Sequence, residues 1–136
     1  MTYAVAHKAI RRRFETEWGS TSSVQWPNKK FIIPEITWVR FTIVDSASNW
    51  ASMGDPDNNV QRNLGQVIVN IFTLKGEGEG ESTELADKVK DVFRSWNDSE
   101  SGVRFVVPPY ARQVKGADKK WYQVNVVAPF RFDDFT

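Results

Sequence analysis

Apolar residues recur every three or four positions in two stretches of the chain, which is the spacing of one face of a helix. The first stretch predicts a helix over residues 2–18, with Thr2 as its N-cap and Gly19 as the residue that ends it. The second predicts a helix from Ser82, its expected N-cap, to about Trp96. The apolar positions behind these predictions are Tyr3, Ala6, Ile10, Phe14 and Trp18, then Leu85, Ala86, Val89, Val92, Phe93 and Trp96.

Alternation of apolar and polar residues predicts two long strands, at residues 38–45 and 61–74. A short strand is expected at residues 103–107 and the last strand at residues 120–132, and the pattern also allows one at Phe31–Ile33. Pro129 indicates that the last strand either ends there or lies at a sheet edge. Residues 46–60 are rich in Ser, Asn, Asp, Gly and Pro, which predicts a long loop at the tip of an antiparallel hairpin.

Each predicted helix has one apolar face, and the economical arrangement packs both on one side of an antiparallel sheet of four or five strands. The sequence therefore predicts an α+β fold in a single domain that spans residues 1–136. The other face of the sheet is expected to be solvated or covered by a partner. The residues expected on that mixed polar face are Arg40, Thr42, Gln66, Asn70, Gln123 and Asn125.

The composition narrows the class of protein without defining a function. The chain has 136 residues and a formal net charge of +1, whereas a general nucleic-acid binder usually carries a larger basic excess. The absence of Cys excludes disulfides and thiolate metal sites, and the single His excludes any site that needs two imidazoles. No apolar run approaches the length of a membrane span, so we expect no membrane contact.

Two segments resemble known binding loops only in part. The segment that begins at Asp55 starts like a calcium loop, but Val60 stands where that loop needs Gly and Gln66 where it needs Glu. Residues 76–81 alternate Gly and Glu between a predicted strand and a helix, where a phosphate-binding loop would lie. The glutamates would repel a phosphate, so we interpret this segment as a flexible connector and the first one as a solvated tip.

The charged residues are grouped along the chain. His7 lies among Lys8 and residues 11–13 on the first predicted helix, and we interpret it as a surface histidine rather than a general base. Residues 76–100 hold eight acidic and three basic residues, a net charge of −5. Residues 101–120 hold five basic residues and one acidic residue, a net charge of +4. Such blocks suit contacts between copies, and they also suit ordinary solvated surfaces.

Trp50 and Met53 are apolar residues in a polar loop, where they either contact a partner or fold back on the core. With the charged residues of the sheet, the connector and the helices, they define a candidate partner or subunit interface. The residues of this candidate interface are Arg11, Arg12, Arg40, Trp50, Met53, Asp55, Asp57, Arg62, Glu77, Glu79, Arg112 and Lys115.

Several short pieces of the sequence occur in the order found in a family of small phage proteins. The first half of the chain contains Trp26-Pro27-Asn28, Phe31, Pro34-Glu35 and Trp38-Val39-Arg40-Phe41. The second half contains Gly65, Val67-x-Val69-x-Ile71-Phe72, Leu85-Ala86-Asp87, Phe93-Arg94, Gly102-Val103-Arg104, Trp121-Tyr122-Gln123-Val124-Asn125-Val126 and Pro129-Phe130. Over nearly its whole length the chain therefore resembles the tail terminator-like proteins of long-tailed bacteriophages.

The resemblance implies a structural virion protein and no enzyme. Such proteins cap the tail tube, end its polymerisation and present a surface for the filled head, typically as a ring of six copies. The implied partners are further copies of the chain, the tail tube protein and a head–tail connector or neck protein, with DNA only passing through the ring. The implied location is the tail or neck of the virion, and the host cytoplasm during assembly. No catalytic residue, cofactor or metal ligand is implied.

Three other functions remain open on the residues alone. Another neck component, such as a head–tail connector or tail-completion protein, would have a similar composition. A nucleic-acid-binding module would need aromatic stacking residues framed by Lys and Arg on the exposed sheet face, and that pattern is missing. An enzyme would need a carboxylate pair that no spacing of Asp and Glu in this sequence suggests.

Overall fold

The computed structural model describes residues 3–52, 54, 59–76, 78–114 and 120–135, and it contains two helices within this part of the chain. Helix α1 spans Tyr3–Trp18 and buries four of the residues predicted for its apolar face, Ala6, Ile10, Phe14 and Trp18. Helix α2 spans Gly80–Phe93, so the prediction from Ser82 to Trp96 places both ends too late.

Ser82 is not the N-cap of α2. It is fully buried in the first turn, and its Oγ donates a hydrogen bond to the carbonyl of Glu79 at 3.0 Å. Glu79 occupies the N-cap position without a side-chain capping bond. The helix ends before Ser95, whose φ of 56° is left-handed and turns the chain away.

The sheet has five strands in the order β1-β2-β3-β5-β4. The strands are β1 (Ser23–Gln25), β2 (Trp38–Trp50), β3 (Val60–Leu74), β4 (Tyr110–Val114) and β5 (Trp121–Phe135). All neighbouring pairs are antiparallel except β1 and β2, which run parallel. The fold is therefore α+β as predicted, but the prediction of a purely antiparallel sheet is wrong. Residues 26–37 carry the chain from the end of β1 back to the end of the sheet at which β1 began, so β2 runs parallel to it.

The predicted boundaries of several strands are also wrong. Residues 46–50, predicted as loop, continue β2 because they pair with the start of β3. Residues 103–107 form no strand, since only Arg104 makes bridges there, to Asn97 and Arg131. The strand lies after the two prolines instead, at β4, and residues 31–33 are irregular. β5 continues through Pro129 and lies between β3 and β4, so the prediction that the last strand ends at Pro129 or lies at a sheet edge is wrong. Pro129 is tolerated because it comes two residues past Val127, where the pairing with β4 stops.

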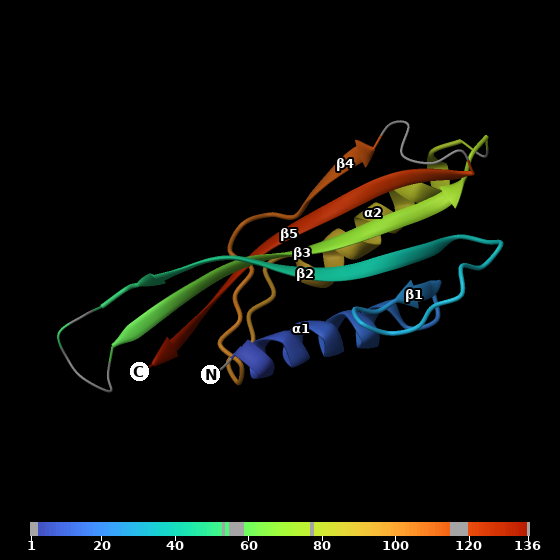
Figure 1. The fold of residues 1–136 in the computed structure, drawn as a ribbon. Coiled ribbons are helices and arrows are strands. Elements are labelled where there is room, and N and C mark those ends of the chain that lie inside the picture. The colour runs from blue at the N-terminus through green and yellow to red at the C-terminus, as the bar shows by residue number, and fades with distance from the viewer. Residues whose placement is uncertain (1–2, 53, 55–58, 77, 115–119, 136) are drawn as a thin grey trace.

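The main core lies on one face of the sheet, where the strands align in rows. One row contains Val39, Ile71 and Val124, which are register partners across β2, β3 and β5. The apolar side chains of both helices belong to the same buried cluster as this face. In Figure 1, α2 lies behind β3 and β5, and α1 lies beside it below β2. Phe14 joins the layers, because its ring lies 5.1 Å from that of Phe41 and 6.1 Å from that of Phe93.

The opposite face of the sheet, here called the open face, carries a second and smaller cluster. Trp38, Phe72 and Trp121 are buried there, with Phe31 and Leu74 packed against them. The rings of Trp38 and Phe72 stack at 4.2 Å. The open face is therefore partly apolar at one end of the sheet, where the residues predicted for it were mainly polar.

At the other end of the sheet, three strands run on past the start of α1 (Figure 1). Residues 46–50 of β2, 60–64 of β3 and 131–135 of β5 pair with one another there, and we call this part the arm. The pairing shifts register between Asp45 and Ala47, which marks a bulge where the arm begins.

Gly65 is the residue at the base of the arm that has no room for a side chain. A Cβ at this position would lie 2.7 Å from Cζ of Phe130 and 2.9 Å from the backbone oxygen of Val44. We predict that Gly65→Ala destabilises the protein by about 1–3 kcal/mol, because a backbone atom cannot rotate away. Thermal unfolding measures the effect. Gly80→Ala is the matched control, since nothing lies within 4 Å of its Cβ. Equal melting temperatures for the two variants would contradict the prediction.

Candidate assembly surfaces

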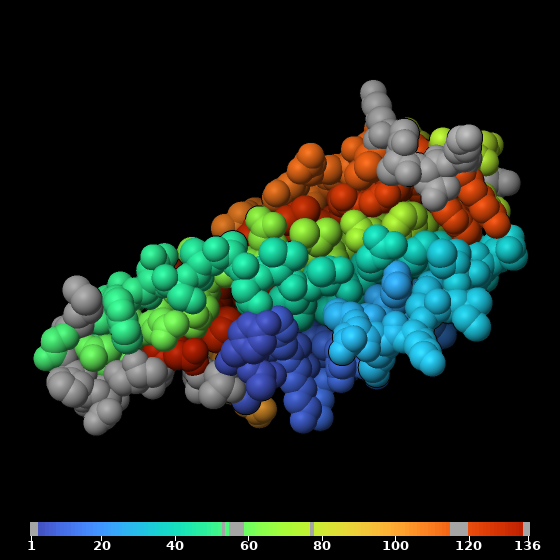
Figure 2. Space-filling model, in the orientation of Figure 1, coloured from blue at the N-terminus to red at the C-terminus, as the bar shows by residue number. Residues whose placement is uncertain are grey.

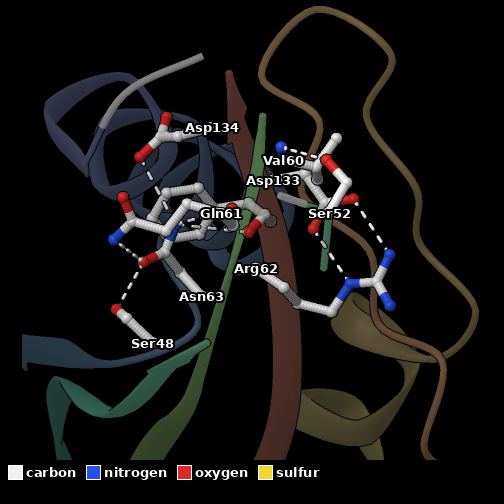
Figure 3. A network of polar contacts seen from close by, with 9 residues as sticks. Ser48, Ser52, Val60, Gln61, Arg62, Asn63, Asp133 and Asp134 are labelled. Carbon is white, nitrogen blue, oxygen red and sulfur yellow. Dashed lines mark hydrogen bonds and ion pairs between the residues drawn. The ribbon is translucent and has the colours of Figure 1, made fainter. Parts of the chain in front are cut away.

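A network of polar side chains holds the strands of the arm together (Figure 3). On one face, Arg62 donates from Nε to Oδ1 of Asp133 at 3.0 Å and from Nη2 to Oδ2 at 3.3 Å. The hydrogen bond and the negative charge of Asp133 both raise the pKa of Arg62. Both side chains are only part-exposed, so this two-bond contact ties β3 to β5.

The other face of the arm is organised by Asn63. Its Oδ1 accepts hydrogen bonds from Oγ of Ser48 at 2.6 Å and from Nε2 of Gln61 at 3.4 Å. Its Nδ2 donates to Oδ2 of Asp134 at 3.3 Å, so one amide connects β2, β3 and β5 (Figure 3). Oδ1 of Asp134 is buried without a hydrogen-bond partner among the described residues. The arm is thus held mainly by polar contacts and has little core of its own.

Trp50 ends β2 at the far end of the arm, where its side chain is 55% exposed. It pairs with Gln61 through the backbone and so belongs to a strand, not to the predicted loop. Neither a fold back onto the core nor a partner is seen for it in the described structure. Of the other predicted interface residues, Met53, Asp55, Asp57, Glu77 and Lys115 lie outside the described residues.

Two predicted interface residues, Arg40 and Arg112, belong to one polar row that crosses the open face. The register aligns Gln25, Arg40, Asn70, Asn125 and Arg112, one from each of the five strands. Nε of Arg40 donates to Oε1 of Gln25 at 3.0 Å, and Nδ2 of Asn70 donates to Oδ1 of Asn125 at 2.6 Å. The guanidinium of Arg40 also lies over the buried rings of the open face, 5.2 Å from that of Phe72.

The two helices expose opposite charges. On α1, Arg11 and Arg12 are exposed, whereas Arg13 turns toward α2 and donates from Nε to the carbonyl of Val92 at 2.9 Å. The exposed positions of α2 include Glu84 and Asp87. Just before α2, Oε2 of Glu79 accepts a hydrogen bond from Nε2 of Gln113 on β4 at 3.5 Å. The predicted residues Arg11, Arg12 and Glu79 are therefore on the helix layer, far from the arm residues Trp50 and Arg62.

His7 lies between Tyr3 and Asp45, at the start of α1. Its Nε2 lies 3.3 Å from the carboxylate of Asp45, and its ring lies 4.1 Å from that of Tyr3. The hydroxyl of Tyr3 donates a hydrogen bond to Asp45. This bond and the negative charge of Asp45 both raise the pKa of Tyr3. These contacts attach the start of α1 to the base of the arm.

The segment between β1 and β2 exposes a group of isoleucines that sequence reasoning missed. Ile32, Ile33 and Ile36 are 92%, 56% and 66% exposed. Nearby, Nζ of Lys120 lies 2.7 Å from Oε2 of Glu35, which lowers the pKa of that carboxyl. A signal for this surface was present, because an apolar run interrupted by proline is a poor candidate for a central strand. Exposed apolar groups of this kind mark interaction sites.

The described surface has several hollows but no cluster of ligating side chains. Three hollows of about 410, 330 and 300 Å³ lie at the start of α2 near Ile36, at the base of the arm near Tyr3, and beside α1 near Arg11. Among the described residues, no group of His, Cys, Asp or Glu is placed to hold a metal ion. Neither described helix has the length and apolar character needed to cross a bilayer.

The chain was compared with known proteins. A family model described as phage tail terminator protein matches residues 6–130. The match covers most of the chain, and the chain therefore belongs to the phage tail terminator family. This result confirms the resemblance drawn from the sequence. It assigns the protein a structural role in a phage tail, a location in the virion tail and interactions with tail and head components.

Solved structures support the fold. Fifteen solved chains match this one. One of them superposes with a TM-score of 0.71 at 18% sequence identity, over 100% of this chain and 99% of that chain. At this identity the likeness concerns the fold alone. No curated protein matches the chain.

The contact between Arg62 and Asp133 is expected to keep the arm ordered. We predict that Arg62→Met, which retains most of the aliphatic stem, speeds backbone amide exchange severalfold in residues 47–50 and 60–63. Amide exchange in the central rows of the sheet should stay unchanged, because they depend on the core. Arg94→Met is the control, since it removes an exposed ion pair with Asp91 at 3.2 Å within one helix end. Unchanged exchange in the arm would show that the pair has no such role.

Proposed function

We propose that this protein caps the end of the phage tail tube, stops its polymerisation and presents the surface to which the filled head is joined. The observation that carries the proposal is the family match over residues 6–130. We further propose that the working form is a closed ring of six copies, with the tail tube protein and a head–tail connector or neck protein as its partners. DNA meets the protein only in passing through the ring, no cofactor takes part, and assembly occurs in the host cytoplasm.

The shape of the subunit supports this proposal. A closed ring needs head-to-tail contacts, in which two different surfaces of the same chain meet. The sheet has two unlike edges, with β1 and the isoleucine segment on one side and β4 on the other. The arm extends beyond both helices and is available for a partner above or below the plane of such a ring (Figure 1).

The decisive experiment mixes the purified protein with tail tubes of its phage and measures particle mass together with negative-stain images. We expect rings, either free or seated on one end of each tube, and tubes that stop growing. Binding to filled heads with no effect on tubes would favour a different neck protein, such as a connector. Binding to neither would contradict the proposal.

We propose that Trp50, at the end of the arm, contacts the tail tube or the neck partner. A half-exposed tryptophan on a projecting strand is typical of a residue that dominates binding energy. We predict that Trp50→Ala leaves the melting temperature unchanged and weakens binding to tubes or heads by about 30-fold or more. Tyr110→Ala is the matched control, because this aromatic residue is 44% exposed on β4, away from the arm. If both variants bind like wild type, the arm is not the contact.

A further inference from the structure

One edge of the molecule is basic and carries exposed isoleucines. Arg11 of α1 and Lys29 of the following segment line the same hollow of about 300 Å³, together with Glu15. Lys30 and Ile32 follow Lys29 in the same segment, and Ile32 is 92% exposed, the highest value among the described large apolar residues. We call this surface the basic flank, and it consists of Arg11, Arg12, Lys29, Lys30, Ile32 and Ile33.

The surface of α2 has the opposite charge. Glu84, Asp87 and Asp91 are exposed at spacings of three and four, so they form one stripe along the helix. Asp87 also lies at a hollow of about 210 Å³ between α2 and β4, which includes the apolar residues Ala86 and Val124. We call the stripe and this hollow the acidic flank. Lys90 lines the hollow as well, so its rim offers groups of both signs to a partner.

The two flanks lie at opposite edges of the molecule. β1 and β4 are the two edge strands of the sheet, and the basic flank follows β1 while the hollow borders β4. Figure 2 shows the segment that leads to β2 at one long edge and β4 at the other. The two surfaces therefore cannot meet within one copy, but they can meet between copies.

We propose that the basic flank of one copy packs on the acidic flank of the next, with Ile32 entering the hollow between α2 and β4. This inference rests on the proposed ring and names its subunit contact. The isoleucine would be the buried anchor, and the lysines would set orientation against Glu84 and Asp87. The contact joins two different surfaces, so each copy binds one neighbour through its basic flank and another through its acidic flank. Repeated around an axis, such contacts can close into a ring.

A second copy fits these features better than a different partner. The exposed isoleucine and a hollow with Ala86, Ala111 and Val124 in its lining occur on the same chain, as do the basic flank and the acidic stripe of α2. A tube or connector protein would account for one flank and leave the other without a role.

The first test introduces charge at the proposed anchor. The variant combines Ile32→Asp with Ile33→Asp. Because both isoleucines are exposed in the single copy, we expect the variant to fold and to keep the circular dichroism spectrum of the wild type. We expect ring formation, measured by particle mass alone and on tail tubes, to weaken by about 100-fold or more. The matched control combines Val106→Asp with Val107→Asp, which are 58% and 47% exposed outside both flanks, and it should form rings like wild type.

The second test reverses the charges on each flank separately. One variant combines Lys29→Glu with Lys30→Glu, and the other combines Glu84→Lys with Asp87→Lys. Each alone should fail to form rings, because like charges face each other at every contact. An equal mixture should restore rings in which the two variants alternate, since every contact then pairs opposite charges. Rings from either variant alone, or none from the mixture, would overturn the assignment.

The outcomes separate this inference from the proposed function. If the wild type forms rings and the isoleucine variant does so equally, the subunit contact is wrong while the capping role stands. If the variant still forms rings but no longer binds tubes, the segment contacts the tube and the second-copy assignment is overturned. If the wild type forms no ring alone or on tubes, the ring and its contact are both wrong.

Discussion

The register between β2, β3 and β5 is the constraint on which the other features of the molecule depend. It places Val39, Ile71 and Val124 in one buried row, and further apolar rows follow on the same face. Because side chains alternate along a strand, a shift of one residue would turn these rows to solvent. The same alignment brings Asn70 and Asn125 together on the open face. The core under the helices and the polar row across the sheet are therefore two results of a single pairing.

The arm follows from the unequal reach of helices and strands. A helix rises about 1.5 Å per residue, so the 16 residues of α1 cover about 24 Å. A strand rises about 3.3 Å per residue, so the 15 residues of β3 extend about 50 Å. The five arm residues of each long strand, about a third of β3, consequently lie beyond the helices. Phe132 of the arm is still buried in the main core, but the polar side chains farther out have no helix to pack on. Hydrogen bonds from Asn63 and the contact of Arg62 with Asp133 therefore hold the strands together there.

Features with a strong local pattern could be predicted, and those that depend on a distant partner could not. Both helices and the central strands follow from apolar spacing, because one face of each is buried. The polar sequence of residues 46–50 predicts a loop. These residues form a strand because they pair with β3, which no local pattern indicates. β1 and β4 are short edge strands that take their structure from one neighbour each. Residues 103–107 look like a strand, but Val106 and Val107 are exposed and two prolines follow.

The candidate surfaces also depend on which distant residues the fold brings together, and the charged residues are the clearest example. From the sequence, the acidic residues 76–100 and the basic residues 101–120 suit either the two halves of a contact between copies or ordinary solvated surfaces. In the fold, however, Arg112 lines the same hollow as Asp87, so members of the two blocks lie together on one edge of one copy. Two blocks on the same edge of a copy cannot face each other across a head-to-tail contact, which joins opposite edges. The basic surface that remains available for a neighbour's α2 lies at the far edge, beside Lys29 and the exposed Ile32, and only the strand order brings this to light.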